Sequence, residues 1–236
     1  MRRPSQSSDQ NRLLAALPRR DYQRLARDIE VVPLTFGQVL HEPGDRFRRV
    51  YFPHRGVVSL LTMVGPGKGA EVGMVGNEGV VGGSAALGID VSHLRAVVQG
   101  DGVAARISSR RLQQALGTHA SWYRELFRFS HALMGQVAQT AACNRFHKFE
   151  QRLARWLLTT RDRVQSRHIH LTHQFLSLML GVRRTGVTAA AASLQKRGLI
   201  SYRRGNIQLL DVKGLEASAC PCYRVVSETY RRSYLT

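Results

Sequence analysis

The stretch Leu171-Thr-His-Gln-Phe-Leu-Ser-Leu-Met-Leu-Gly-Val-Arg-Arg-Thr-Gly-Val-Thr-Ala-Ala-Ala-Ala-Ser-Leu-Gln-Lys-Arg-Gly198 decides the fold of the C-terminal part of the chain. Apolar residues recur at helical spacing on both sides of Gly181, which predicts two short helices joined by a sharp turn. Thr172 can cap the first helix because its hydroxyl accepts a hydrogen bond from a free first-turn amide. The apolar stripe of the second helix consists of Val187, Ala191 and Leu194.

The opposite face of the second helix is polar and basic. It carries Arg184, Thr185, Thr188 and Lys196. Two helices with a glycine turn and such a face are typical of the helix-turn-helix, whose second helix enters the major groove of DNA. The alternative is a pair of core helices with a solvated charged face.

A basic hairpin is predicted directly after these helices. Residues 199–202 and 207–210 have the composition of short strands, and Arg203-Arg-Gly-Asn206 between them is rich in turn formers. Such a hairpin is a wing, and Arg203 and Arg204 are placed to contact the phosphate backbone. The wing favours the DNA-binding interpretation over the core-helix alternative.

Composition points to the same class of partner. Lys+Arg 35 against Asp+Glu 16 gives a net charge of +19, which suits nucleic acid first and an anionic membrane surface second. Nearly half of the basic residues but under a third of the acidic ones lie from Arg145 onward. No apolar run approaches the roughly 20 residues of a membrane span, and no secretory signal is recognisable. The three cysteines are too few for a disulfide scaffold, so we expect a cytoplasmic protein without a membrane partner.

The N-terminal half of the chain has a different sequence pattern. Short apolar runs punctuated by glycine predict an antiparallel sandwich or roll. The expected strands are 31–34, 38–40, 50–52, 56–61, 71–75, 94–98 and 102–107, with the turn 65–69 between two of them. Short helices are expected at 11–17, 19–27 and 108–116.

A long helix is predicted over about residues 121–143. A broken heptad pattern indicates a dimerisation helix, although a core helix is the alternative. The residues assigned to the dimer contact are Leu126, Phe129, Leu133 and Val137. A second helix is predicted over 146–163, with Arg152, Arg155 and Arg161 on its outer side, followed by a polar connection at 165–170.

The order of a roll, a long helix and a winged helix-turn-helix resembles the Crp/Fnr superfamily of bacterial transcription regulators. The most specific stretches are 144–158, 171–198 and 50–59. The resemblance implies an α+β fold, with an antiparallel β-roll domain at 11–118, a dimerisation helix at 119–144 and a winged helix-turn-helix domain at 145–236. It also implies a cytoplasmic homodimer on a palindromic double-stranded DNA site, no enzymatic activity, and RNA polymerase as a partner.

The resemblance also assigns contacts by position. Thr172 and Gln174 match residues that contact phosphate, and Arg184 matches the arginine that reads a guanine. Departures from the family pattern are Thr185, where an acidic residue is common, and Ala189, where a second base-reading arginine stands. Arg183 replaces a common serine and adds a base or phosphate contact.

The sequence does not fit the known effectors of the family. The phosphate cassette of the cyclic-nucleotide-binding members is degenerate here, because Val81-Gly82-Gly83 lacks the glutamate and Arg95 is displaced from Ser92-His93. We therefore expect no cyclic AMP. No cysteine precedes Cys143, which argues against an iron–sulfur cluster, and haem binding through His41, His54 or His93 is not expected. A constitutive DNA binder whose roll is only a scaffold is an open alternative to a regulator controlled by an unknown signal.

A protein that acts through a metal or redox site is the remaining alternative to a DNA-binding regulator. Cys220-Pro-Cys222 together with His168, His170 and His173 supplies the right residue types, but Cys-x-Cys lacks the usual spacing of a zinc site. The sequence favours cysteines that pack the tail, and no metal ligand is assigned.

Overall fold

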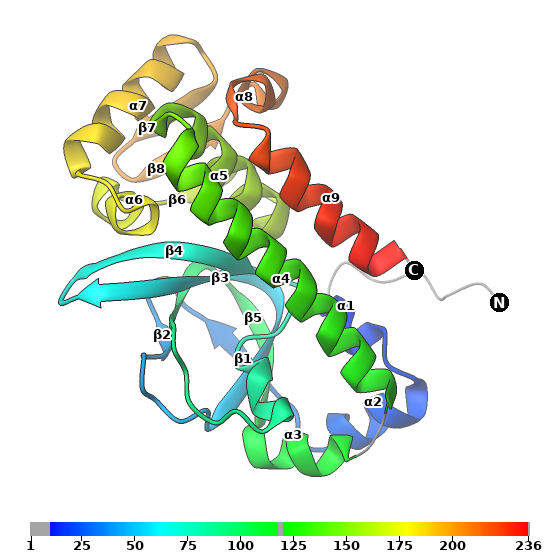
Figure 1. Ribbon diagram of the computed structural model, residues 1–236. Helices are drawn as coiled ribbons and strands as arrows, with labels where there is room; N and C mark the ends of the chain where they lie inside the picture. The colour runs from blue at the N-terminus through cyan, green and yellow to red at the C-terminus, as the bar shows by residue number, and fades with distance from the viewer. Residues whose placement is uncertain (1–9, 118–119, 236) are drawn as a thin grey trace. The chain divides into compact units, whose positions relative to one another are not determined.

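The computed structural model describes residues 10–117 and 120–235, which form two compact units (Figure 1). The first contains the chain up to Leu60 and Met74–His131, and the second contains Leu61–Gly73 and the chain from Ala132 onward. The boundary thus lies inside the long helix α4 (Ala120–Phe146). The predicted division at residues 118 and 144 stays a prediction.

The first unit is an antiparallel roll with short helices around it, as predicted. The strands of the roll are β1 (Glu30–Leu34), β2 (Val39–His41), β3 (Arg49–Gly65), β4 (Lys68–Val75) and β5 (Arg95–Ser108), of which the parts of β3 and β4 within Leu61–Gly73 belong to the second unit. The short helices of the first unit are α1 (Arg12–Ala15), α2 (Arg19–Ala26), η1 (Gly83–Leu87) and α3 (Ser109–Leu116). The sheet order is β1-β5-β3-β4, with β2 also paired to β5, and Glu30 lies opposite Arg106 in the β1–β5 pair.

Two interruptions that the sequence predicted between neighbouring strands are absent. The runs 50–52 and 56–61 form the single strand β3, and the runs 94–98 and 102–107 form the single strand β5. The glycines between them permit a close approach of the two backbones: a Cβ on Gly102 would lie 2.1 Å from the Arg55 carbonyl oxygen, and one on Gly56 2.6 Å from that of Gly100. Each expected pair of strands therefore forms one continuous strand, and the prediction of a break between them was wrong.

Asn11 fixes the start of the first unit. Its side chain is fully buried, and its Oδ1 accepts from the amides of Leu13 and Leu14, both at 3.1 Å, as the N-cap of α1. Its Nδ2 donates to the carbonyls of Pro53 at 2.9 Å and Gly79 at 2.8 Å. One side chain therefore caps a helix and joins it to two other segments.

The second unit contains the helices and the small sheet of the C-terminal region. After the end of α4, its helices are α5 (Phe149–Val164), α6 (His173–Leu180), α7 (Arg184–Lys196), α8 (Val212–Ser218) and α9 (Cys222–Leu235). Its sheet has the order β6-β8-β7, from β6 (His168–His170), β7 (Ile200–Arg203) and β8 (Asn206–Leu209). The polar connection predicted at 165–170 is partly wrong, because His168–His170 pairs with the free edge of β8.

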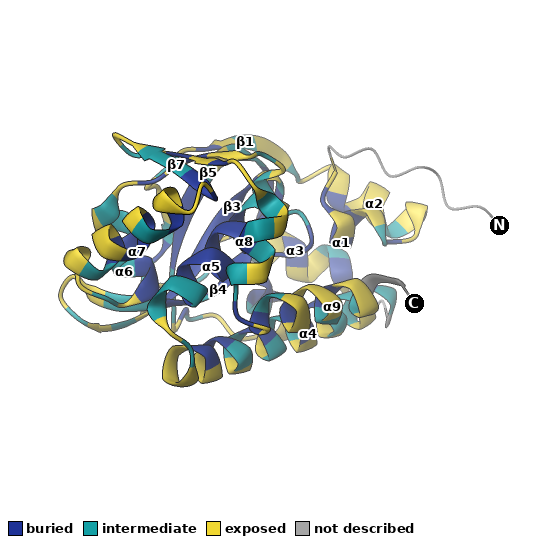
Figure 2. Cartoon of the chain, turned by 90° about the horizontal axis from the view of Figure 1, so that it is seen from above, coloured by how far each residue is buried: buried dark blue, intermediate teal, exposed yellow. Residues whose placement is uncertain are grey.

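Helix α5 is the core of the second unit, and it is buried on almost every side (Figure 2). It contacts α7, α8 and α9, and the indole of Trp156 donates to Glu71 at 3.0 Å. Arg152 and Arg155 were predicted to lie outward, but they are only 9% and 5% exposed. That prediction was wrong because helices pack on the face that carries them as well as on the apolar face.

The predicted dimer contact on α4 also needs correction. Leu126 and Phe129 are 1% and 3% exposed, because they pack inside their own unit, where Phe129 covers Gly79. Leu133 and Val137 are half-buried beside Gly73. The heptad pattern therefore selects mainly the face of α4 that packs within the chain. Phe127 and Met134 are instead the large apolar residues exposed along this helix between Ser121 and Asn144, at 59% and 64%.

No helix among residues 10–117 and 120–235 combines the length and the apolar character that a membrane crossing requires.

Replacing Asn11 by alanine is expected to lower the free energy of unfolding by about 2–4 kcal/mol, because the cap is lost and two buried carbonyls lose their donor. Asn11→Asp keeps the two accepted bonds but buries a carboxylate oxygen against the Pro53 and Gly79 carbonyls, so its loss should be at least as large. Urea unfolding measures both. Wild-type stability in Asn11→Ala would contradict the proposed role of this side chain.

Candidate nucleic-acid interface

The two helices of the opening stretch form as predicted. The Thr172 hydroxyl accepts from the Phe175 amide at 3.1 Å and caps α6. Gly181 ends α6 with a left-handed φ of +62°, which glycine adopts without strain. Arg183 is the N-cap of α7, and Val187, Ala191 and Leu194 are buried on its inner side.

Every residue assigned to DNA contact is exposed. The base-reading candidates are Arg183, Arg184, Thr185 and Thr188, and the phosphate candidates are Thr172, Gln174, Lys196, Arg203 and Arg204. Arg184 is the first residue of α7, where the free amides and the positive end of the helix dipole also favour an anion. The outer face of α7 is therefore cationic at its N-terminal end.

His173 joins the two helices and the wing, a role that the sequence did not reveal. Its Nδ1 lies 3.0 Å from the Thr188 hydroxyl, which also donates to the Arg184 carbonyl at 3.1 Å. The Tyr202 ring packs edge-on against His173 at 4.6 Å between ring centroids, and its hydroxyl donates to the Leu171 carbonyl at 2.7 Å. The Thr188 hydroxyl is thus engaged within the chain.

Burial shifts the pKa values of two groups in this network, His173 and Tyr202. It lowers the pKa of His173, with a further contribution from the charge of Arg184. Burial also raises the pKa of Tyr202 to about 12, against the opposing effect of the same arginine. His173 therefore favours its neutral form. As a result, its ring adds no second positive charge beside Arg184.

The wing is a tight hairpin. Between β7 and β8 stand Arg204 and Gly205, both with positive φ, at +48° and +81°. Two successive residues of this kind make a type I′ turn, whose twist matches that of paired strands. The turn places the exposed side chains of Arg203 and Arg204 at the tip of the hairpin, as predicted.

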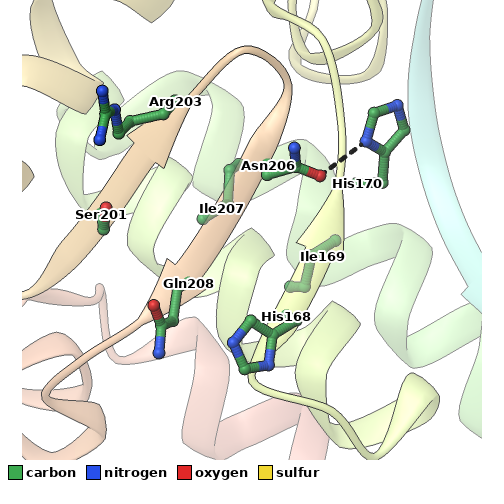
Figure 3. A pocket seen from close by; sticks show the side chains of 8 residues that line it. All are labelled: His168, Ile169, His170, Ser201, Arg203, Asn206, Ile207 and Gln208. Atoms are coloured by element: carbon green, nitrogen blue, oxygen red, sulfur yellow. Dashed lines mark hydrogen bonds between the residues drawn. The ribbon is translucent and has the colours of Figure 1, made fainter.

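A polar pocket of about 340 Å³ lies on one face of the wing sheet (Figure 3). Cross-strand pairing aligns one row of His168, Gln208 and Ser201, and another of His170, Asn206 and Arg203. His170 Nδ1 lies 2.9 Å from the Asn206 side-chain oxygen. The other pocket-lining residues, Ile169 and Ile207, are buried. The alternating polar positions on three strands were the sequence signal for this surface, and recognising β6 was needed to see it.

The residues of the degenerate effector pocket lie in the first unit. Gly82, with a φ of +79°, and Gly83 begin η1, and His93 is exposed. The Ser92 hydroxyl donates to the Leu94 carbonyl at 2.7 Å. Arg95 forms a bidentate ion pair with Glu42, at 2.8 and 2.7 Å, so its guanidinium already has a carboxylate partner.

The helix-turn-helix with its hairpin is a winged helix-turn-helix domain, a class of DNA-binding module. Residues 151–218 match the family of Crp-like helix-turn-helix domains. The C-terminal segment is therefore a Crp-like helix-turn-helix domain, as the sequence resemblance predicted. No curated protein matches this sequence.

Solved structures show that the likeness extends over most of the chain. A regulator assigned to the Crp/Fnr family from Eubacterium rectale is 16% identical, with a TM-score of 0.68 over 86% of this chain and 94% of its own. A CRP-family regulator from Thermus thermophilus is 19% identical, with a TM-score of 0.67 over 80% and 96%. The c-di-GMP-responsive global regulator of Xanthomonas campestris is 18% identical, with a TM-score of 0.67 over 82% and 100%. The chain thus has the fold of the Crp/Fnr transcription regulators.

Acidification is expected to destabilise the second unit through His173. Because the pKa of His173 lies below its ordinary value of 6.5, the unfolded chain binds this proton more readily than the folded one. The free energy of unfolding should therefore fall as the pH drops below about 6.5 toward the folded-state pKa, and should be unaffected well above it.

Urea unfolding of the wild type and His173→Gln, between about pH 5 and 8, measures this contribution. The loss of stability on acidification should be smaller in the variant. His168→Gln, at an exposed position of the wing sheet, is the matched control. An identical pH profile for His173→Gln and the wild type would refute the assignment.

Proposed function

We propose that the chain is a sequence-specific DNA-binding transcription regulator that acts as a homodimer on a palindromic site. The observation that carries the proposal is the exposed Arg184 at the start of α7, in a Crp-like domain whose wing presents Arg203 and Arg204. The net charge of +19 supports a polyanionic partner. The proposal assigns the chain no catalytic role.

The exposed residues divide into two kinds of contact. Arg184 reads a guanine through its two-pronged guanidinium, with Arg183 and Thr185 beside it, and the methyl group of Thr188 suits a thymine methyl. Phosphate contacts come from side chains at the rim of this surface and on the wing. These are Thr172, Gln174, Lys196, Arg203 and Arg204. With Thr185 and Ala189 at two positions that usually help to read bases, the preferred site differs from that of the best-known relatives.

Helix α4 supplies the dimer contact through its exposed stripe. The residues Phe127, His131, Met134, Ala138, Ala141 and Arg145 are all exposed and follow one another at alternating spacings of four and three. This is the periodicity of a coiled-coil seam, and its small residues permit close approach of a second helix. Two recognition helices about 34–36 Å apart would then fit successive turns of the major groove.

The first unit is proposed to respond to something other than a cyclic nucleotide, or to nothing. The pairing of Arg95 with Glu42 supports this, because a cyclic phosphate would have to compete with a bidentate carboxylate. Haem and an iron–sulfur cluster are likewise not proposed. A thermal-shift titration with cyclic AMP tests the point: unchanged melting is expected, and a rise with nucleotide would contradict it. We further propose RNA polymerase as the protein partner at a promoter.

Selection of bound sequences from a random DNA pool tests the main proposal. A palindrome with half-sites one helical turn apart is expected. A pool that shows no enrichment would refute sequence-specific binding.

Arg184→Ala and Arg203→Ala form a matched pair of charge removals. Arg184→Ala is expected to weaken binding to the selected site by about 1–3 kcal/mol and to relax the preference at one base pair. Arg203→Ala should weaken binding to all sequences alike and reduce the salt slope by about 1. Fluorescence anisotropy at several salt concentrations measures both, and exchanged effects would overturn the assignment of α7 as the recognition helix.

Met134→Glu is expected to split the dimer, because it places two like charges in an apolar seam. Sedimentation velocity should show a monomer, with a loss of affinity for the palindrome. Leu210→Glu makes a similar change at an exposed apolar position outside α4 and should leave a dimer. A dimeric Met134→Glu protein would exclude this stripe as the dimer contact.

A further inference from the structure

Three cysteines and one histidine meet where α9 begins beside the end of α4. Cys143 lies on the last turns of α4, His147 follows that helix directly, and Cys220 and Cys222 flank the start of α9. Helix α9 runs along the C-terminal half of α4 (Figures 1 and 2), where the Tyr230 hydroxyl donates to the Gln136 side-chain oxygen at 2.8 Å. Residues 77 positions apart in the sequence, Cys143 and Cys220, thus come together inside one unit.

We propose that Cys143, His147, Cys220 and Cys222 bind one Zn²⁺ ion in a closed, structural site. Their potential ligand atoms all lie within 4.8 Å of one another. Three thiolates and an imidazole are one of the usual ligand sets of structural zinc. The proposal concerns the second unit itself and does not depend on DNA binding.

The distances fit a tetrahedral ion. Cys143 Sγ lies 3.4 Å from Cys220 Sγ, and Cys222 Sγ lies 3.5 Å from His147 Nδ1. With Zn–S near 2.3 Å and Zn–N near 2.0 Å, the edges of a tetrahedron are about 3.8 Å between sulfurs and about 3.5 Å between sulfur and nitrogen. These two pairs need shifts of a few tenths of an ångström, and pairs as far apart as 4.8 Å would have to close by about 1 Å, which rotation of the side chains can supply.

The surroundings suit a site of net negative charge. The three cysteines are at most 1% exposed, and three thiolates on Zn²⁺ leave one uncompensated negative charge. Arg155 lies close enough to Cys143 and Cys220 to interact electrostatically with both thiols. Arg152 interacts with the same two thiols. Buried guanidinium groups beside the thiols thus supply the compensating positive charge.

Two features of the groups around the cysteines suit bound thiolates. The Nε atoms of Arg152 and Arg155 are buried and have no hydrogen-bond partner among the described residues, and metal-bound thiolates would balance the charges of both side chains. Gln139 Nε2 already donates to Cys222 Sγ at 3.0 Å, as the outer-shell partner of a ligand does. Cysteines that merely packed the tail would not need this donor.

This site corrects the ligand set considered from the sequence. His168 and His170 lie on the wing sheet, and His173 contacts Thr188, so none of the three is the partner of the cysteines. His147 was overlooked because its relation to Cys143 is a spacing of four at a helix end, far from Cys220 in sequence. The short Cys-x-Cys spacing is compatible with zinc here because two further ligands come from another element.

Metal binding would attach α9 to the segment between α4 and α5. Binding replaces the thiol protons: Zn²⁺, three thiols and a neutral imidazole give the complex and release three protons, fewer where a thiol is already ionised. The backbone amide of Cys220 also donates to the Gln151 carbonyl of α5 at 3.5 Å. Zinc would therefore stabilise the packing on which the helix-turn-helix rests.

The first test uses the full chain without a histidine tag, reduced and freed of metal. Titration with Co²⁺ should give one equivalent of bound metal, with thiolate charge-transfer absorption and the d–d bands of a tetrahedral ion. Zn²⁺ should displace the cobalt and raise the melting temperature. A spectrum without thiolate bands, or a Cys143–Cys220 disulfide in protein alkylated directly after lysis, would overturn the proposal.

Variants identify the ligands. His147→Ala keeps every cysteine and should weaken Co²⁺ binding by about 100-fold or more, whereas Gln139→Leu should weaken it by about tenfold. His168→Ala is the matched control and should bind like the wild type. If Cys143→Ser fails to fold, His147→Ala, whose side chain is half-buried, still decides the matter. Equal binding by His147→Ala and His168→Ala would refute this ligand set.

Discussion

The second unit depends on helix α5, which is buried on almost every side. This helix nevertheless carries two buried arginines, Arg152 and Arg155. The Arg152 guanidinium donates to the Leu180 carbonyl at 2.7 Å, at the point where α6 ends. That bond satisfies a carbonyl that the helix itself leaves free and fixes the turn before α7. On the same helix, Arg155 lies by the cysteines. The buried charge of α5 therefore connects the start of the recognition helix to the environment of the thiols.

Local sequence patterns were sufficient to predict much of the fold. The cap at Thr172, the left-handed Gly181 and the buried stripe of α7 follow from chemistry within a few residues, and so did their prediction. The hairpin at Arg204 and Gly205 is equally local. The exposed arginines of the candidate interface could be named because the buried positions around them were identified correctly. Their contacts to DNA remain a prediction.

What the sequence did not reveal depends on tertiary packing. Arg152 and Arg155 look like solvent residues until neighbouring helices cover both faces of α5. Leu126 and Phe129 look like a seam until the glycines of the roll are placed against them. Gly56 and Gly102 were expected to begin new strands, yet they lie within continuous strands where two backbones approach closely. His147 has no local pattern that joins it to Cys220, so that juxtaposition required coordinates.

The wing tip places a positive charge where backbone strain must be tolerated. Arg204 has a φ of +48°, a conformation that costs a non-glycine residue roughly 1 kcal/mol. Asparagine or glycine in place of Arg204 would adopt this turn more easily. The hairpin is therefore less stable than it would be with glycine or asparagine at position 204, but it carries a positive charge at its tip. Selection for thermal stability alone would therefore be expected to remove this arginine, whereas selection for nucleic-acid affinity would keep it.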